Sequence, residues 1–227
     1  MSTSQPEPIT VDIWSDIACP WCYIGKRKLE DALRRFDELP EAVPVKVEYH
    51  SFELAPDTPV DFDGTEVDFL VRHKRMSEAD VRHMLATVTR IARSVGLEYD
   101  FDAVKHTNTL KAHQLLHHAK AHGRQLEAKE RLLRAYFVEG RHLGRIDELA
   151  QLAAEIGLDP DGARQALHAD RYLPAVRADQ DRATRLGIRG VPFHVIDGRF
   201  GLSGAQRPET FLDALRRAVT EREAVRG

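Results

Sequence analysis

The sequence predicts an α/β fold in which a small sheet, layered with helices, holds a large all-helical insertion. Three observations predict it. The chain opens with the order strand, helix, strand; it closes with strand, strand, helix; and the residues between show helical periodicity almost throughout. Because strand patterns occur only toward the two ends, the simplest geometry is one sheet with the insertion between its halves. We expect the sheet domain to comprise residues 8–56 and 171–227, and the insertion residues 57–170.

The N-terminal half of the sheet domain is predicted from two strand patterns that flank an amphipathic helix. Residues 9–14 form an apolar run typical of a strand. A helix is expected over residues 23–39, ending before Pro40, because its apolar residues recur on one face. Residues 44–52 alternate apolar and polar side chains, which is typical of a second strand.

Capping signals divide the central helical block. Ser77 with Asp80 resembles a capping box and opens a helix that ends near Gly96. Asn108 is expected to cap the following helix, which runs to Gly123. Further helices are expected over residues 124–139, over 147–156, from Asp159-Pro160 onward, and over 172–186.

The C-terminal half of the sheet domain is predicted from a hairpin and a final helix. The strand pattern returns at residues 191–196, and Asp197-Gly198 is a typical hairpin turn before a partner strand over residues 199–202. Pro208 opens the last helix, whose apolar stripe begins at Phe211.

Composition excludes some classes of function. The chain has 227 residues, a net charge of −3 and 30% charged residues, so it has no broad basic field for nucleic acid. No apolar run approaches the length of a membrane span. The residues before Ile9 lack the basic and apolar regions of a secretory signal, and we therefore expect a cytoplasmic protein.

Both cysteines lie in one tetrapeptide, Cys19-Pro20-Trp21-Cys22, between the first strand and the first helix. Proline suits the first helical turn, where its missing N–H costs nothing. Cys19 is therefore expected at the N-terminus of a helix, where free N–H groups and the helix dipole favour a thiolate. Cys22 lies one turn further on, close enough to attack a mixed disulfide formed by Cys19.

A stable disulfide is rare in the cytoplasm, so the pair is expected to be catalytic, redox-sensing or metal-binding. Half of a zinc site is the alternative to redox chemistry, but zinc takes four ligands and the chain has no further cysteine. Four histidines could supply the rest, although we expect them on a solvated or partly packed helix face: His113, His117, His118 and His122. We therefore expect redox chemistry and no metal.

The sequence resembles the thioredoxin fold, and within it the DsbA-like branch with its helical insertion. The carrying segments are residues 16–26 (DIACPWCYIGK), 52–54 (FEL), 187–193 (GIRGVPF) and 201–206 (GLSGAQ). They are most similar to the FrnE-like group of DsbA-family proteins, which is related to 2-hydroxychromene-2-carboxylate isomerases and kappa-class glutathione transferases. The resemblance covers nearly the whole chain.

The resemblance implies roles for particular residues. It implies that Pro192 is a cis-proline facing the cysteine pair, which would let the backbone of Val191 pair with an extended substrate. Pro20 and Trp21 are expected to contact the substrate as well. Because Trp21 is uncharged, unlike the histidine between the cysteines of periplasmic DsbA, we expect a more reducing centre here.

Cys22 needs a proton acceptor before it can attack the mixed disulfide. The candidates nearest in sequence are Asp16, at the end of the first strand, and Glu53, after the second. Either is equally compatible with an ordinary surface carboxylate.

The function expected first is a thiol–disulfide oxidoreductase that reduces or isomerises disulfides in a protein or in a small molecule. We expect no tightly bound cofactor, with glutathione as a candidate redox partner, and a homodimer is compatible with the sequence. The alternative is a glutathione-dependent isomerase or transferase acting on a small aromatic molecule, with Val191 and Ser203 at the glutathione-binding positions. Those relatives generally carry serine in place of the nucleophilic cysteine. A third reading is a redox-sensing or holdase-like binder without turnover.

Overall fold

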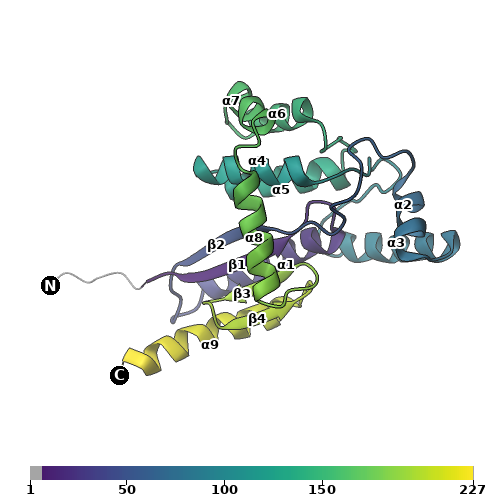
Figure 1. Cartoon of the computed structure of the whole chain (residues 1–227). Helices are drawn as coiled ribbons and strands as arrows, with labels where there is room; N and C mark the ends of the chain where they lie inside the picture. The colour runs from purple at the N-terminus through teal and green to yellow at the C-terminus, as the bar shows by residue number, and fades with distance from the viewer. Residues whose placement is uncertain (1–6, 227) are drawn as a thin grey trace.

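The computed structural model describes residues 7–226, and most of the segment from which a secretory signal was judged absent lies outside them. Its sheet has four strands in the order β2-β1-β3-β4 (Figure 1). β1 runs parallel to β2 and antiparallel to β3, and β3 pairs antiparallel with β4. The bounds are β1 Ile9–Ser15, β2 Val45–Ser51, β3 Phe193–Ile196 and β4 Phe200–Ser203.

One face of the sheet packs against α1 (Pro20–Asp37) and α9 (Pro208–Arg226). Side chains alternate along a strand, so Ile9, Val11 and Ile13 of β1 all point toward these two helices. They bury themselves against the apolar stripes of α1 and α9, which include Phe36 and Phe211. This cluster is the core of the sheet domain.

The opposite face packs against α8 (Leu173–Arg185). Trp14 of β1 is fully buried there with Ala183 and Ile188, and its indole N–H donates a hydrogen bond to the carbonyl of Asp179, 3.0 Å away. α8 contacts both β2 and the insertion helix α4, so it joins the two parts of the molecule.

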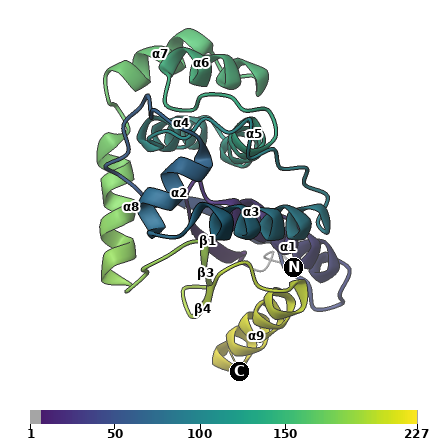
Figure 2. The same cartoon turned by 90° about the vertical axis from the view of Figure 1, so that its right-hand side faces the viewer.

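The insertion contributes six helices: α4, α5, α6 and α7 lie on the far side of β1 and β2 from α9, while α2 and α3 follow one another beside the start of α1 (Figures 1 and 2). α4 and α5 lie nearer the sheet than α6 and α7. The insertion core continues into the sheet domain, because Ile17, Tyr23 and Ile24 at the start of α1 belong to it. The bounds are α2 Glu66–Lys74, α3 Glu78–Arg93, α4 Leu110–Ala121, α5 Gln125–Phe137, α6 Ile146–Glu155 and α7 Pro160–His168.

Helix starts follow the capping signals with one correction. The Ser77 hydroxyl accepts from the N–H of Asp80, and the Asp159 carboxylate accepts from the N–H groups of Asp161 and Gly162, as expected. Asn108 is not the cap of α4: the cap position is Thr109, and the Asn108 amide oxygen accepts from the N–H of Leu110. An Asn can bond the N–H two residues on whether or not it is the cap, which is why the residue type pointed to the wrong position.

The structure sets two further element boundaries. α1 begins at Pro20, as the proline of the first helical turn predicts, one turn ahead of the apolar periodicity that starts at residue 23. β3 begins at Phe193 rather than at Val191, because Val191 and Pro192 belong to the loop beside Cys19. Within residues 7–226, none of the helices combines the length and the apolar character that crossing a membrane requires.

Candidate active site

The cysteine pair occupies the start of α1, directly after β1. Cys19 has an extended backbone, with φ −97° and ψ 110°, and is the N-cap; Pro20 follows as the first helical residue. The N–H of Cys22 donates to the carbonyl of Cys19 at 3.0 Å, so both sulfurs lie on one helical turn. Both thiols are free and nearly buried.

The loop before β3 closes over Cys19. The Val191–Pro192 bond is cis, as the resemblance implies, and the Cys19 thiol donates to the Val191 carbonyl at a sulfur–oxygen distance of 3.5 Å. Gly25 makes this close packing possible, because a Cβ added there would lie 3.2 Å from Cγ of Pro192. The structure thus brings Val191 and Pro192 against the cysteine pair, as the sequence predicts.

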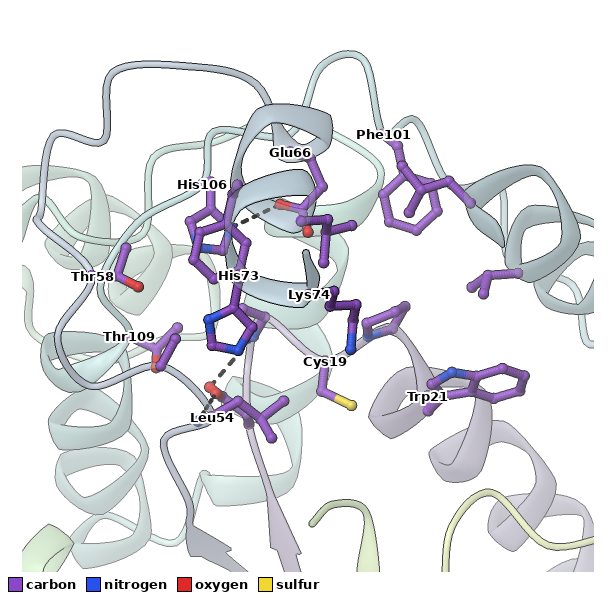
Figure 3. A pocket seen from close by; sticks show the side chains of 18 of the residues that line it. Cys19, Trp21, Leu54, Thr58, Glu66, His73, Lys74, Phe101, His106 and Thr109 are labelled. Atoms are coloured by element: carbon purple, nitrogen blue, oxygen red, sulfur yellow. Dashed lines mark hydrogen bonds and ion pairs between the residues drawn. The ribbon is translucent and has the colours of Figure 1, made fainter. Parts of the chain in front are cut away.

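A cavity of about 320 Å³ opens beside Cys19 (Figure 3). Cys19 lines it and Cys22 does not, so Cys19 is the sulfur that a bound molecule can reach. Pro20, Trp21 and Val191 line the same cavity, and Trp21 is 38% exposed beside it. The insertion supplies the opposite wall with apolar side chains and several ionisable ones: Phe69, Leu70, Met84, Leu85, Val88, Phe101, Glu66, His73, Lys74 and His106.

The two thiols share one negative charge. Burial raises the pKa of Cys22, but the hydrogen bond from the Cys19 thiol, the charge of Lys129 and the Ser15 hydroxyl outweigh it, so this pKa is lowered. The side-chain interaction with Cys22 and burial raise the pKa of Cys19, so the lower pKa belongs to Cys22 and not, as the helix N-terminus led us to expect, to Cys19. Loss of the first proton therefore gives a thiolate at Cys22 that is stabilised by the neighbouring Cys19 thiol. Loss of the second proton, from Cys19, is strongly opposed by that negative charge and by burial.

Asp16 lies between the end of β1 and the cysteines and is almost fully buried. Its carboxylate accepts from the N–H groups of Ile17 at 2.6 Å and Leu54 at 2.7 Å, and it lies 3.2 Å from Nε2 of His113. Burial raises its pKa, but His113 and the Leu54 N–H outweigh burial and lower it. Asp16 thus ties the segment before Cys19 to α4 and to the segment after β2.

The structure places Glu53 elsewhere. Its carboxylate accepts from Gln180 at 2.6 Å and from Arg177 at 3.1 Å, both on α8, and it does not line the cavity. The structure therefore brings Asp16 to the cysteine pair and leaves Glu53 on the α8 side.

Lys129 of α5 is a feature that sequence reasoning missed. It is fully buried, its ammonium nitrogen has no hydrogen-bond partner, and that nitrogen lies 5.3 Å from the centroid of the Tyr49 ring. Burial lowers its pKa to about 8, although the charges of Cys22 and Asp16 favour the ammonium. The available signal was its position on the apolar face of α5, next to Ala128 and ahead of Leu132 and Leu133.

The histidines of α4 also differ from expectation, because His113, His117 and His118 are buried rather than solvated. α4 packs against α5, α6, α7 and α8, and two of these histidines meet carboxylates, His113 at Asp16 and His117 at Asp179. Within residues 7–226, the group of three metal-donor side chains that the fold assembles is Asp12, Glu48 and His50, which includes neither cysteine.

Comparison with known proteins assigns the fold and the family. The sequence model of the DsbA-like thioredoxin domain matches residues 10–216. A probable DsbA oxidoreductase from Streptomyces coelicolor is similar in structure, with 38% identity, a TM-score of 0.86, and coverage of 94% of this chain and 91% of that chain.

Two more distant solved structures share the fold. A 2-hydroxychromene-2-carboxylate isomerase has 15% identity and a TM-score of 0.72, with coverage of 95% of this chain and 98% of that chain. DsbM of Pseudomonas aeruginosa, described as a cytosolic disulfide reductase and also solved with GSH, has 23% identity and a TM-score of 0.59, with coverage of 95% and 97%. The cysteine pair, the Val191–Pro192 loop and the cavity thus lie on a fold that this chain shares with both of these proteins.

Proposed function

Because this chain belongs to the DsbA-like thioredoxin domain family, we propose that it is a thiol–disulfide oxidoreductase that reduces or isomerises substrate disulfides through Cys19 and Cys22. The observation that carries the proposal is the asymmetry of the pair: Cys19 opens onto the cavity, while Cys22 lies behind it with the lowered pKa. The sequence also fits the FrnE-like subgroup.

The reaction uses two exchanges. The Cys19 thiol passes its proton to Cys22, and its sulfur attacks one sulfur of a substrate disulfide, forms a mixed disulfide and releases the first substrate thiolate. Cys22 then loses that proton, and its thiolate attacks the Cys19 sulfur, closes the Cys19–Cys22 disulfide and releases the second substrate thiolate. Two electrons pass from the protein to the substrate, and a thiol pool such as glutathione returns them.

The direction proposed is reduction or isomerisation in the cytoplasm. A cytosolic glutathione pool near about −220 to −320 mV keeps most such centres reduced, so net oxidation of substrates is disfavoured there. Trp21 is uncharged and so adds no electrostatic stabilisation to the thiolate of the reduced pair. This supports a reducing centre, because less stabilisation of the reduced form makes the pair a better electron donor.

The experiment is the reduction of insulin by dithiothreitol, followed as turbidity, with the unmodified protein and with Cys19→Ser and Cys22→Ser. We expect the unmodified protein to accelerate precipitation and Cys19→Ser to be inactive. Cys22→Ser should trap mixed disulfides with insulin, which a non-reducing gel resolves. Activity that survives Cys19→Ser would exclude the proposal.

The cavity favours a second candidate, the glutathione-dependent conversion of a small aromatic molecule. About 320 Å³ lies within the range of small-molecule sites, and the wall is largely apolar and aromatic. This candidate predicts that Cys19→Ser retains turnover of such a substrate with glutathione, since the related isomerases and transferases generally use serine. Inactive insulin reduction together with that retained turnover would select it.

A further inference from the structure

Lys129 places a fully buried ammonium group over the Tyr49 ring of β2, where its charge interacts with those of the cysteine pair. A buried ammonium without a hydrogen-bond partner is costly, so it requires compensating negative charge nearby. The groups whose charge favours it are Cys22, Asp16 and Cys19, whereas Lys26 of α1 opposes it and the Tyr49 ring of β2 faces it. Against burial, the pKa of Asp16 is lowered by His113 and the Leu54 N–H, which favours its carboxylate, while the cysteine charge exists only when the pair is reduced.

The position of Lys129 is fixed from both sides of α5. Four residues earlier, the Gln125 side chain accepts from the N–H of Tyr49 at 3.0 Å and donates to its carbonyl at 2.8 Å. One residue later, the Glu130 carboxylate accepts from Tyr23 and from Lys26, both at 2.6 Å. α5 is thus tied to β2 and to α1, and Lys129 lies between the two attachments.

The other candidates for the proton of Cys22 are already engaged. Asp16 uses its oxygens to hold two backbone N–H groups and His113, and Glu53 is bonded to α8. An amine whose basicity burial has reduced is suited to exchange protons near neutral pH.

We propose that Lys129 is a positioning residue that stabilises the Cys22 thiolate and exchanges a proton with Cys22 during resolution of the mixed disulfide. This inference rests on the thiol–disulfide chemistry proposed above.

The step balances within the site. In the mixed disulfide, the neutral Lys129 amine takes the proton of the Cys22 thiol and becomes an ammonium. The Cys22 thiolate attacks the Cys19 sulfur, the Cys19–Cys22 bond forms, and the bond from Cys19 to the substrate sulfur breaks. The departing substrate thiolate takes up a proton, and the ammonium, now without the thiolate charge, releases one.

The first test titrates the thiolate absorbance of the reduced protein in Lys129→Met, which keeps the length of the side chain and removes its charge. We expect the lower of the two thiol pKa values to rise by about one unit or more. At a pH below that pKa, the thiolate fraction then falls by about tenfold. Lys120→Met removes an exposed lysine from α4 and should leave this pKa unchanged. An unchanged pKa in a folded Lys129→Met protein would overturn the proposal.

The second test follows the reduced protein with the aromatic disulfide 5,5′-dithiobis(2-nitrobenzoate). The first release of thionitrobenzoate reports attack by Cys19, and the second reports resolution by Cys22. In Lys129→Met we expect the second release to slow by about tenfold at neutral pH, because the thiolate fraction falls by that factor, and to recover at high pH. A second release as fast as in the unmodified protein, over the whole pH range, would contradict the assigned role.

A third measurement uses the unmodified protein, in case Lys129→Met does not fold. NMR of the Lys129 side-chain nitrogen should show a higher pKa in the reduced protein than in the disulfide form, because only the reduced pair carries the thiolate. Equal values in the two forms would overturn the proposal. The thiol titration and NMR need no substrate, so they remain interpretable if insulin reduction fails.

Discussion

At the scale of single residues, Trp21 lies between the two cysteines in the first turn of α1, where a charged side chain would act on a thiolate at the helix N-terminus. It lines the cavity and is partly exposed, so a substitution there need not disturb the core. Trp21→His introduces a group that is cationic near neutral pH and stabilises the reduced, thiolate-bearing form.

We predict that Trp21→His makes the centre more oxidising, with at least a tenfold shift of its equilibrium constant with glutathione. Equilibration in glutathione buffers, followed by thiol alkylation, measures the ratio of oxidised to reduced protein. Trp21→Phe is the matched control and should stay close to the unmodified protein. An equal or more reducing Trp21→His protein would contradict the electrostatic argument.

His194 of β3 shows the effect of burial on a titrating side chain. It is 1% exposed, packs edge-to-face on Phe211, and is not among the residues that line the cavity. Burial lowers its pKa to about 4. The unfolded chain, with an ordinary histidine pKa of about 6.5, therefore binds a proton in the interval where the folded chain does not.

The lowered pKa of His194 in the folded protein means that protonation favours the unfolded chain, so stability falls as the pH falls. The contribution of His194 to stability is complete above pH 6.5 and falls as the pH drops to about 4, by about 3 kcal/mol in all. Urea unfolding of His194→Gln at several pH values should show a flatter dependence over this interval than the unmodified protein. His83→Gln, at an exposed position on α3, should leave the slope unchanged.

At the scale of elements, α5 is attached to α1 by one carboxylate. Glu130 accepts from Tyr23 and forms ion pairs with Lys26 and Arg27. Burial raises the pKa of Glu130, but these three partners outweigh it and lower the pKa to about 2.

We predict that Glu130→Gln lowers the free energy of unfolding by about 1–2 kcal/mol near neutral pH, since the ion pairs with Lys26 and Arg27 are lost in a partly screened site. The loss should shrink as the pH falls from about 4.5 toward 2, where the native carboxylate is protonated too. Glu127→Gln is the matched control: Glu127 pairs with Arg124 at the start of its own helix, and its loss should cost less than about 0.5 kcal/mol. If Glu130→Gln lowered the free energy of unfolding no more than Glu127→Gln does, the contacts of Glu130 would not stabilise the packing of α5 on α1.

Local sequence rules predicted most of the helices and strands, and the family resemblance predicted the part of the site formed by Cys19, Val191 and Pro192. The periodicity of β1, β2 and α9, and the caps Ser77 and Asp159, are local signals, and the structure confirms them. Cys19, Val191 and Pro192 were placed together because two short segments carry a family resemblance.

The buried side chains on the insertion side of the cysteine pair, Lys129 and His113, were not predictable in the same way. Lys129 acts on Cys22, which lies more than one hundred positions earlier, and His113 bonds Asp16 across a separation of 97. Nothing local to either residue identifies its partner. A lysine or histidine on an apolar helix face signals only that some partner is needed, and tertiary packing supplies it.

At the scale of the whole molecule, α1 belongs to two hydrophobic clusters. Tyr23 and Ile24 in its first turns pack with the insertion helices, while Leu29 and Phe36 further along pack with the sheet and α9. Displacement of α1 would therefore expose apolar surface in both clusters at once.

We therefore predict that the sheet domain and the insertion unfold in one transition. The tryptophan band of the near-ultraviolet circular dichroism reports the packing around Trp14, which is buried in the sheet domain, and far-ultraviolet circular dichroism reports helices throughout. The two signals should give the same urea midpoint. Separate midpoints would show that the two parts are independent folding units.

The side chain of Gln125 has a further consequence, which concerns the rim of the sheet. β2 is an edge strand, and such strands expose backbone groups that can recruit a strand from another chain. Here the Gln125 amide occupies the N–H and the carbonyl of Tyr49, and Asp179 takes the N–H of Ser51. Two side chains thus stand in for a fifth strand, and the opposite edge, β4, is only four residues long. The molecule is thereby protected against aggregation through its sheet by an amide and a carboxylate rather than by additional backbone.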